Sequence, residues 1–195
     1  MTMLGARAYL SGLARAFDEV EATAAESVPL SLDEAVERAS SVIAGLRASG
    51  RKAMLIGNGG SAGIVSHVHN DLCKAVGVRA VVFTEVPLLT ALANDDGYET
   101  VFQRQVCLWA EAGDLLIAVS SSGESENILR AAAMARDKGC HLITFTGFKP
   151  ANRLRQMGDL NVYVPAANYG YVEMTHSILC HCITDLTVSR LPTRA

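Results

Sequence analysis

Five short runs of strand-forming residues, separated by segments of helical periodicity, constrain the fold more than any other feature of the sequence. Each run is almost continuously apolar, which is typical of strands that are buried on both faces of a parallel sheet. Strands that alternate with helices predict βαβ units. We therefore expect an α/β fold with a doubly wound, five-stranded parallel sheet. Its strands lie at 52–57 (KAMLIG), 79–84 (RAVVFT), 114–120 (DLLIAVS), 141–146 (HLITFT) and 161–165 (NVYVP).

Helical patterns flank these runs at both ends of the chain. Residues 2–25 are amphipathic, and residues 31–50 begin with Ser31 and Glu34 at the spacing of a capping box. A long helical pattern closes the chain from about residue 171 to residue 191. We expect a single domain over 1–195, in which 1–50 form a helical N-terminal extension and 51–195 form the α/β core and the C-terminal helix. These helices exceed what a five-stranded sheet needs for cover, which favours a homo-oligomer.

Composition excludes several classes of function. Half of the 195 residues are hydrophobic, 19% are charged and the net charge is −3, which is typical of a globular chain. No block of Lys and Arg suggests a nucleic acid or an anionic membrane as a partner. No signal peptide and no membrane-spanning run is recognisable. The five cysteines form no CxxC pair and mostly lie in apolar runs, so we expect reduced thiols in a cytoplasmic protein.

Two of the predicted strands end in unusual loops. The strand at 52–57 continues into GNGGSAGIVSHVHND at 57–71, and the strand at 114–120 continues into SSSGES at 120–125. Ligands bind at the carboxyl ends of parallel strands, where glycine N–H groups and helix N-termini can hold an anion. The first loop has neither the G-x-G-x-x-G spacing of a dinucleotide site nor the GK(S/T) of a Walker A loop. Alone, it is more often a tight turn.

The serine-rich loop also has two interpretations. It is either a flexible loop with Ser125 as the N-cap of the next helix, or a set of hydroxyl donors for a ligand, and Ser125 can serve both. Two such loops on neighbouring strands, without positive charge, suit a phosphate monoester that is held by neutral donors.

Histidines and carboxylates follow the first loop and recur in the C-terminal helix. His67 and Asp71 are four residues apart, so both face one side of a helix, whereas His69 faces away. Glu173 and His181 lie eight residues apart, or about two helical turns, and can face a common site only loosely. From spacing alone, each histidine is more often a structural residue than a ligand.

Four segments together resemble the sugar isomerase (SIS) domain: GNGGS (57–61), ALANDDGYETVFQRQV (91–106), AGDLLIAVSSSGESENILRAAAMARDKG (112–139) and LITFTG (142–147). The serine loop alone indicates only this domain. GNGGS together with ANDDGY is more specific, and resembles the phosphoheptose isomerases, which act on sedoheptulose 7-phosphate. The similarity runs from Arg51 to Asp185. It implies a flavodoxin-like sheet, a homotetramer with active sites at subunit interfaces, and a bound Zn²⁺ in each site.

The resemblance also implies a role for individual residues. Asp71 and His181 match the catalytic pair, which moves protons through an enediol in an aldose–ketose isomerisation. Zn²⁺ would be held by His67, Asp71, Glu173 and His181. The phosphosugar would be bound by Asn58, Gly59, Gly60, Ser61, Asn94, Asp95, Ser120, Ser121, Ser122, Ser125 and Glu173. His69 and His176 receive no role.

Two positions depart from the family pattern. Asp71 stands where the family has glutamate, and Glu173 stands where it has glutamine. A catalytic group that is misplaced by ~1 Å can lose ~100-fold in rate, so these changes predict a different phosphosugar or an altered metal geometry as readily as the heptose reaction. Two alternatives remain: a non-catalytic SIS scaffold that binds a replication initiator, and a sugar-phosphate sensor. Because the scaffold branch tends to lose the catalytic carboxylate and the last-helix histidine, keeping Asp71 and His181 speaks against it.

Overall fold

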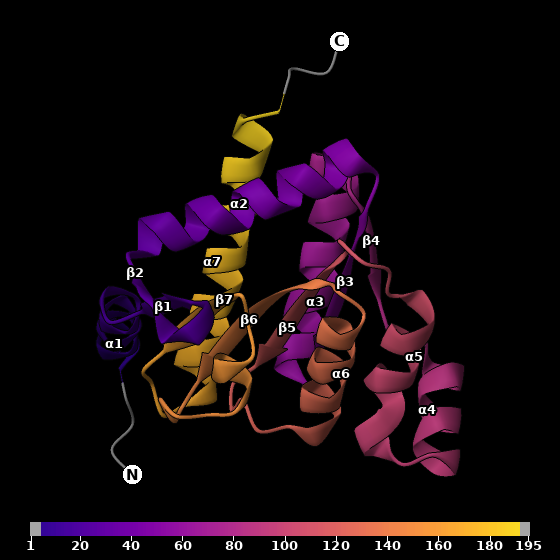
Figure 1. Cartoon of the computed structure of the whole chain (residues 1–195). Coiled ribbons are helices and arrows are strands. Elements are labelled where there is room, and N and C mark those ends of the chain that lie inside the picture. The colour runs from indigo at the N-terminus through magenta and orange to yellow at the C-terminus, as the bar shows by residue number, and fades with distance from the viewer. Residues whose placement is uncertain (1–4, 192–195) are drawn as a thin grey trace.

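A mostly parallel sheet lies between two layers of helices in the computed structural model, which describes residues 5–191 (Figure 1). The sheet has seven strands in the order β2-β1-β7-β6-β5-β3-β4. The strands are β1 (Glu21–Ala24), β2 (Pro29–Leu30), β3 (Lys52–Gly57), β4 (Arg79–Val82), β5 (Leu115–Ser120), β6 (His141–Gly147) and β7 (Leu160–Val164). The helices are α1 (Ala6–Asp18), α2 (Leu32–Ser49), α3 (Gly60–Asp71), α4 (Val86–Asp95), α5 (Val101–Trp109), α6 (Glu126–Asp137) and α7 (Tyr169–Ser189).

The predicted parallel core is confirmed. The strands β4, β3, β5, β6 and β7 pair in parallel in that order, which is the flavodoxin-like arrangement. One apolar core joins the sheet to α2, α3 and α7, and a second core joins its other face to α5 and α6, with α4 packed against their margin (Figure 1). The chain adds β4 on one side of β3 and then β5, β6 and β7 on the other side, so the order of strands reverses between β3 and β5. This switch point is where an α/β sheet binds its ligands.

The N-terminal fifty residues are not wholly helical as predicted. α1 ends at Asp18, and the chain then forms the strands β1 and β2. β1 pairs antiparallel with β7, so that Ala22 lies opposite Val162, and β2 pairs antiparallel with β1. β1 carries little local periodicity, and its partner β7 lies some 140 residues away in sequence, so the sheet pairing decides its conformation. Residues 2–4 of the predicted helix lie outside the described residues.

α2 has the ends that the sequence predicts, and each end of α7 (Tyr169–Ser189) lies two residues before that of the predicted helix at 171–191. Ser31 Oγ accepts from the Glu34 N–H at 3.2 Å and the Ser31 N–H donates to Glu34 Oε2 at 2.9 Å, which completes the capping box. Gly50 ends α2 in the left-handed conformation, with φ at 66°. α7 runs the full length of one face (Figure 1). Within residues 5–191, no helix has both the length and the apolarity to cross a membrane.

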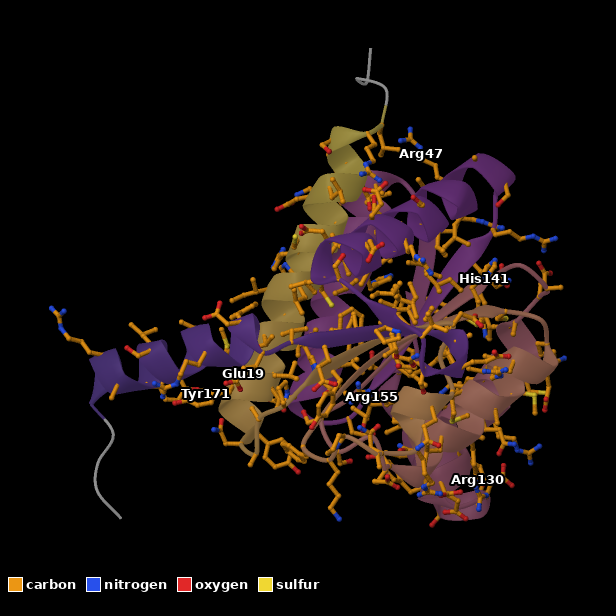
Figure 2. The ribbon with its side chains drawn as sticks, turned by 60° about the vertical axis from the view of Figure 1, so that its left-hand side comes forward. Glu19, Arg47, Arg130, His141, Arg155 and Tyr171 are labelled. Atoms are coloured by element: carbon orange, nitrogen blue, oxygen red, sulfur yellow. The ribbon has the colours of Figure 1, made fainter. Side chains whose placement is uncertain are left out.

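α1 stands away from the sheet and contacts the rest of the chain mainly through α7 (Figure 2). Only Gly12 and Ala16 of this helix are buried. The rings of Tyr9 and Tyr171 lie 4.9 Å apart between centroids. Leu10 remains 62% exposed, so α1 leaves apolar surface uncovered in the single chain.

Candidate active site

The two unusual loops meet at the switch point of the sheet. Because β3 and β5 are parallel neighbours, with Gly57 opposite Val119, the loops that follow them lie side by side. They enclose a cavity of about 230 Å³. The cavity is lined by Asn58, Gly59, Gly60, Ser61, Ser120, Ser121, Ser122, Ser125, Tyr169 and Glu173. All but Tyr169 belong to the predicted substrate-binding set.

The serine loop is shaped by backbone contacts and keeps hydroxyls free. Gly123 adopts a φ of 65°, and its N–H donates to Ser120 Oγ at 3.2 Å. The buried Ser121 hydroxyl has no hydrogen-bond partner among the described residues. Ser125 is the N-cap residue of α6, as predicted by position, but its side chain makes no capping hydrogen bond. The hydroxyls of Ser121 and Ser125 can therefore donate to a ligand oxygen.

The glycine turn brings a helix N-terminus and a carboxylate to the same cavity. Gly59 has a φ of 53° and a ψ of −123°, a combination that side chains avoid, and it begins α3. A Cβ atom at Gly60 would overlap the carboxylate of Glu173. None of the described residues that line the cavity is cationic, and Glu173 is a carboxylate, so backbone N–H groups and the N-terminal end of the α3 dipole are the features there that favour an anion.

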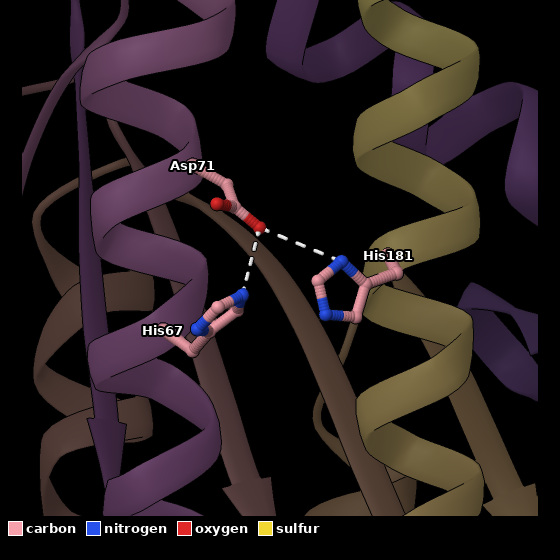
Figure 3. Close-up of side chains that lie close together, drawn as sticks. All are labelled: His67, Asp71 and His181. Atoms are coloured by element: carbon pink, nitrogen blue, oxygen red, sulfur yellow. Dashed lines mark ion pairs between the residues drawn. The ribbon is translucent and has the colours of Figure 1, made fainter.

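A second cluster lies further along α3 and α7, where His67, Asp71 and His181 face one another (Figure 3). Asp71 Oδ2 lies 3.4 Å from His67 Nε2 and 3.6 Å from His181 Nδ1. The imidazole rings are 4.8 Å apart between centroids. The side chains of His67 and His181 are 56% and 48% exposed, against 19% for Asp71. A single chain thus brings the predicted catalytic pair, Asp71 and His181, together, and Asp71 lies between the two histidines.

The donor set of this cluster fits a zinc ion. One ligand atom from each of the three residues lies within 4.8 Å of the others, and two imidazoles with one carboxylate leave a tetrahedral position open. Glu173 is not part of this group among the described residues. It lies eight residues before His181 on α7, which is about 12 Å along the helix axis. The structure therefore places Glu173 in the cavity and the other three residues in the cluster.

Asn94 and Asp95 lie at the end of α4, outside the lining of the cavity. Asn94 Nδ2 donates to Asp95 Oδ1 at 2.8 Å, and both residues are exposed. Sequence reasoning missed Tyr169, which lines the cavity, and also Asn127 and Tyr98, which hold Asn58 by hydrogen bonds. Tyr98 lies three residues after Asp95 of the predicted Asn94–Asp95 pair. Tyr98 and Asn127 both lie within the segments that resemble the family, Tyr98 as the last residue of ANDDGY, but their contact with Asn58 depends on a neighbour that is distant in the chain.

His176 anchors α7 on the end of β6. The side chain is fully buried, and its Nε2–H donates to the Thr146 carbonyl oxygen at 3.0 Å. Its ring packs edge-on against Phe145, with centroids 5.7 Å apart. Burial lowers the pKa of His176 to about 4, so the imidazole is neutral at pH 7.

This histidine makes folding sensitive to acid. The unfolded chain takes up a proton near pH 6.5 and the folded chain only near pH 4, so stability is lost as pH falls between these values. The loss amounts to roughly 3 kcal/mol of the free energy of unfolding. We expect the free energy of unfolding, measured in urea, to fall by this amount between pH 7.5 and pH 4 in the unaltered protein. His176→Gln should lack this part of the decrease. The same dependence of the unfolding free energy on pH in the two proteins would contradict this role of His176.

Comparison with known proteins places this geometry in a family. The SIS domain family matches residues 15–147. The phosphoheptose isomerase of Aliarcobacter butzleri is 34% identical over 166 residues, which cover 82% of this chain and 87% of the relative. That of Burkholderia pseudomallei is 38% identical over 145 residues, covering 71% of this chain and 73% of the relative.

Solved structures agree with the sequence relatives. The phosphoheptose isomerase of Neisseria gonorrhoeae superposes with a TM-score of 0.82 at 29% identity, covering 94% of this chain and 96% of that one. The corresponding protein of Francisella tularensis has a TM-score of 0.84 at 26% identity, covering 97% of this chain and 100% of that one. The chain therefore belongs to the SIS domain family, among the phosphoheptose isomerases.

Proposed function

We propose that the protein is an aldose–ketose isomerase that converts sedoheptulose 7-phosphate to D-glycero-D-manno-heptose 7-phosphate. One observation carries the proposal: this member of the phosphoheptose isomerases keeps the predicted acid–base pair in contact distance, with His181 Nδ1 at 3.6 Å from Asp71 Oδ2. The cavity with neutral donors, at the N-terminal ends of α3 and α7, supports it. Loss of either member of the pair would have favoured the scaffold alternative.

The reaction moves one proton between adjacent carbons and one between their oxygens. Asp71 Oδ2 takes a proton from C1 of the ketose, which leaves an enediol, and returns a proton to C2. His181 receives the proton of the C1 hydroxyl and donates one to the C2 oxygen, so that atoms and charge balance. Asp71 Oδ1 accepts from Asn70 Nδ2 at 3.1 Å, which leaves Oδ2 for this exchange. The free hydroxyls of Ser121 and Ser125 would hold the phosphate and keep the reacting carbons in place.

We infer that His67, Asp71 and His181 also hold Zn²⁺. A zinc ion bound there supplies a Lewis acid for the sugar carbonyl. Glu173 remains a predicted fourth ligand, but its place beside Gly60 favours a contact with the substrate instead. As an acceptor-only carboxylate, it would select for sugar hydroxyl groups.

The proposed assembly is a homotetramer of single SIS domains, with active sites at subunit interfaces. Apolar side chains are exposed on several helices, among them Leu10 on α1, Leu108 and Trp109 on α5, and Met174 and Ile178 on α7. Surface of this kind favours contact between subunits. A partner subunit would also give Asn94 and Asp95, which lie outside the cavity of their own chain, access to a substrate. The cytoplasmic location remains a prediction.

Metal removal tests the proposal. We expect chelator-stripped protein to convert sedoheptulose 7-phosphate slowly, and one added equivalent of Zn²⁺ to restore turnover at least tenfold, as followed by proton NMR. His67→Ala should weaken the recovery because it removes one of three ligands. Equal turnover with and without zinc would keep the enzyme and exclude the metal role. Binding of the sugar phosphate without turnover in either state would favour the sensor alternative.

A further inference from the structure

A network of side chains surrounds the Asn58 amide at the edge of the cavity. Asn58 Nδ2 donates to Asn127 Oδ1 and Asn127 Nδ2 donates to Asn58 Oδ1, both at 3.0 Å. The Tyr98 hydroxyl lies 3.0 Å from Asn58 Oδ1. Asn127 is only 3% exposed, on the first turn of α6, whereas Tyr98 is half-exposed. The three residues come from the loop after β3, from the turn after α4 and from α6.

A backbone group determines the direction of every bond in this network. The Ile128 N–H, which can only donate, is shared between the Ser125 carbonyl oxygen at 3.0 Å and Asn127 Oδ1, also at 3.0 Å. That contact identifies the oxygen of the Asn127 amide, so its nitrogen faces Asn58. The atom of Asn58 that receives this donor must be Oδ1, and the Tyr98 hydroxyl must also donate to it. The orientation of Asn58 thus follows from the main chain of α6.

The consequence concerns the hydrogen-bond character of Asn58. Its Oδ1 accepts from both Asn127 and Tyr98 and has no lone pair left. Its Nδ2 has two hydrogens, of which one is directed at Asn127 Oδ1. The other finds no acceptor among residues 5–191, and Asn58 lines the cavity. Without its two neighbours, the amide would be free to turn and to present an acceptor as readily as a donor.

We propose that Asn127 and Tyr98 are positioning residues that make Asn58 a dedicated hydrogen-bond donor to the substrate. The matching group is an oxygen that only accepts, either of the phosphate or of the sugar carbonyl. Neither Asn127 nor Tyr98 needs to touch the substrate. The inference rests on the proposed function for the identity of the sugar phosphate.

Two conservative substitutions test it. Tyr98→Phe removes only the hydroxyl from a half-exposed ring, and Asn127→Asp keeps the acceptor for the Ile128 N–H but removes the donor to Asn58. We expect the Kd of sedoheptulose 7-phosphate, measured by calorimetry, to rise about fivefold for Tyr98→Phe, in line with one neutral hydrogen bond. We expect a rise of tenfold or more for Asn127→Asp, which places two acceptors face to face. Tyr9→Phe also removes a single phenolic hydroxyl from a partly exposed ring, and Tyr9 is not among the residues that line the cavity, so it is the matched control and should bind normally.

A double-mutant cycle separates positioning from general support of the fold. In an Asn58→Ala background, Tyr98→Phe and Asn127→Asp should each change Kd less than twofold further, because the residue through which they act is gone. Effects that multiply fully in that background would overturn the proposal. Tyr98→Phe keeps the test decisive if Asn127→Asp fails to fold.

The same titrations distinguish this inference from the proposed function. Normal binding without turnover by the unaltered protein counts against the isomerase and leaves the cycle intact. No binding by the unaltered protein contradicts both. Turnover with a Kd that does not change on substitution of Asn58, Tyr98 or Asn127 contradicts only the positioning role.

Discussion

Replacing Asp71 with asparagine is expected to lower the turnover of sedoheptulose 7-phosphate by roughly 100- to 10,000-fold, which is the range for the loss of a general base. The amide keeps the shape of the carboxylate but cannot take a proton. Asp71 is 19% exposed, and its Oδ1 accepts one side-chain hydrogen bond, from Asn70, so the fold should tolerate the change. Proton NMR measures the rate, and thermal unfolding checks the fold.

The matched control for this substitution is Asp137→Asn. Asp137 is exposed and ends α6, as Asp71 ends α3, but it lies outside both the cavity and the cluster. Its turnover should be unchanged. Asp71→Asn with full activity would contradict the role of Asp71 as the base, and would favour Glu173, the carboxylate that lines the cavity.

Gly123→Ala is expected to have the largest effect on stability, at about 2–5 kcal/mol. The φ of 65° costs an alanine about 1–2 kcal/mol, and overpacking adds about 1–3 kcal/mol. The new Cβ would overlap the side chain of Asn152. Asn152 is 1% exposed and is held by the Lys149 carbonyl and the Arg155 N–H at 2.8 and 2.9 Å, so it cannot move aside cheaply.

Gly50→Ala separates these two causes. Gly50 has a φ of 66°, and nothing lies within 4 Å of an added Cβ, so only the backbone cost of about 1–2 kcal/mol applies. Urea unfolding gives the difference between the two variants, which reports the contact with Asn152. In addition, Gly123→Ala should weaken sugar-phosphate binding because Gly123 shapes the serine loop. Equal losses of stability at the two glycines would show that the loop accommodates a side chain.

The residues that the family resemblance assigns to one active site lie in two groups in the structure. The cavity lies at the N-terminal ends of α3 and α7, and the cluster of His67, Asp71 and His181 lies further along both helices. Their separation follows from helical rise, about 1.5 Å for each residue. A phosphate that is held by the serine loop therefore leaves the rest of a long sugar to extend toward Asp71. This geometry suits an extended substrate better than a compact one.

Local patterns were enough to predict the regular elements of the core. The five parallel strands are apolar on both faces, and Ser31, Glu34 and Gly50 delimit α2 by short-range bonds. These signals survive because each depends on neighbours within a few residues. β1 lies within the predicted helix at 2–25, because its conformation is decided by pairing with β7 across most of the chain. β2 lies between the two predicted helices and pairs with β1.

The sequence by itself determined where the candidate functional residues lie along the chain. It showed which loops carry the glycines and serines, and which helices carry His67, Asp71 and His181. It did so because residue type and helical spacing are local properties. Only the tertiary structure decided that Asp71 meets His181 of its own chain, that Glu173 sits over Gly60, and that Asn127 and Tyr98 orient Asn58. Those contacts join α7 to α3, and two distant segments to one amide. They depend on how the helices pack on the sheet, which no short stretch of sequence encodes.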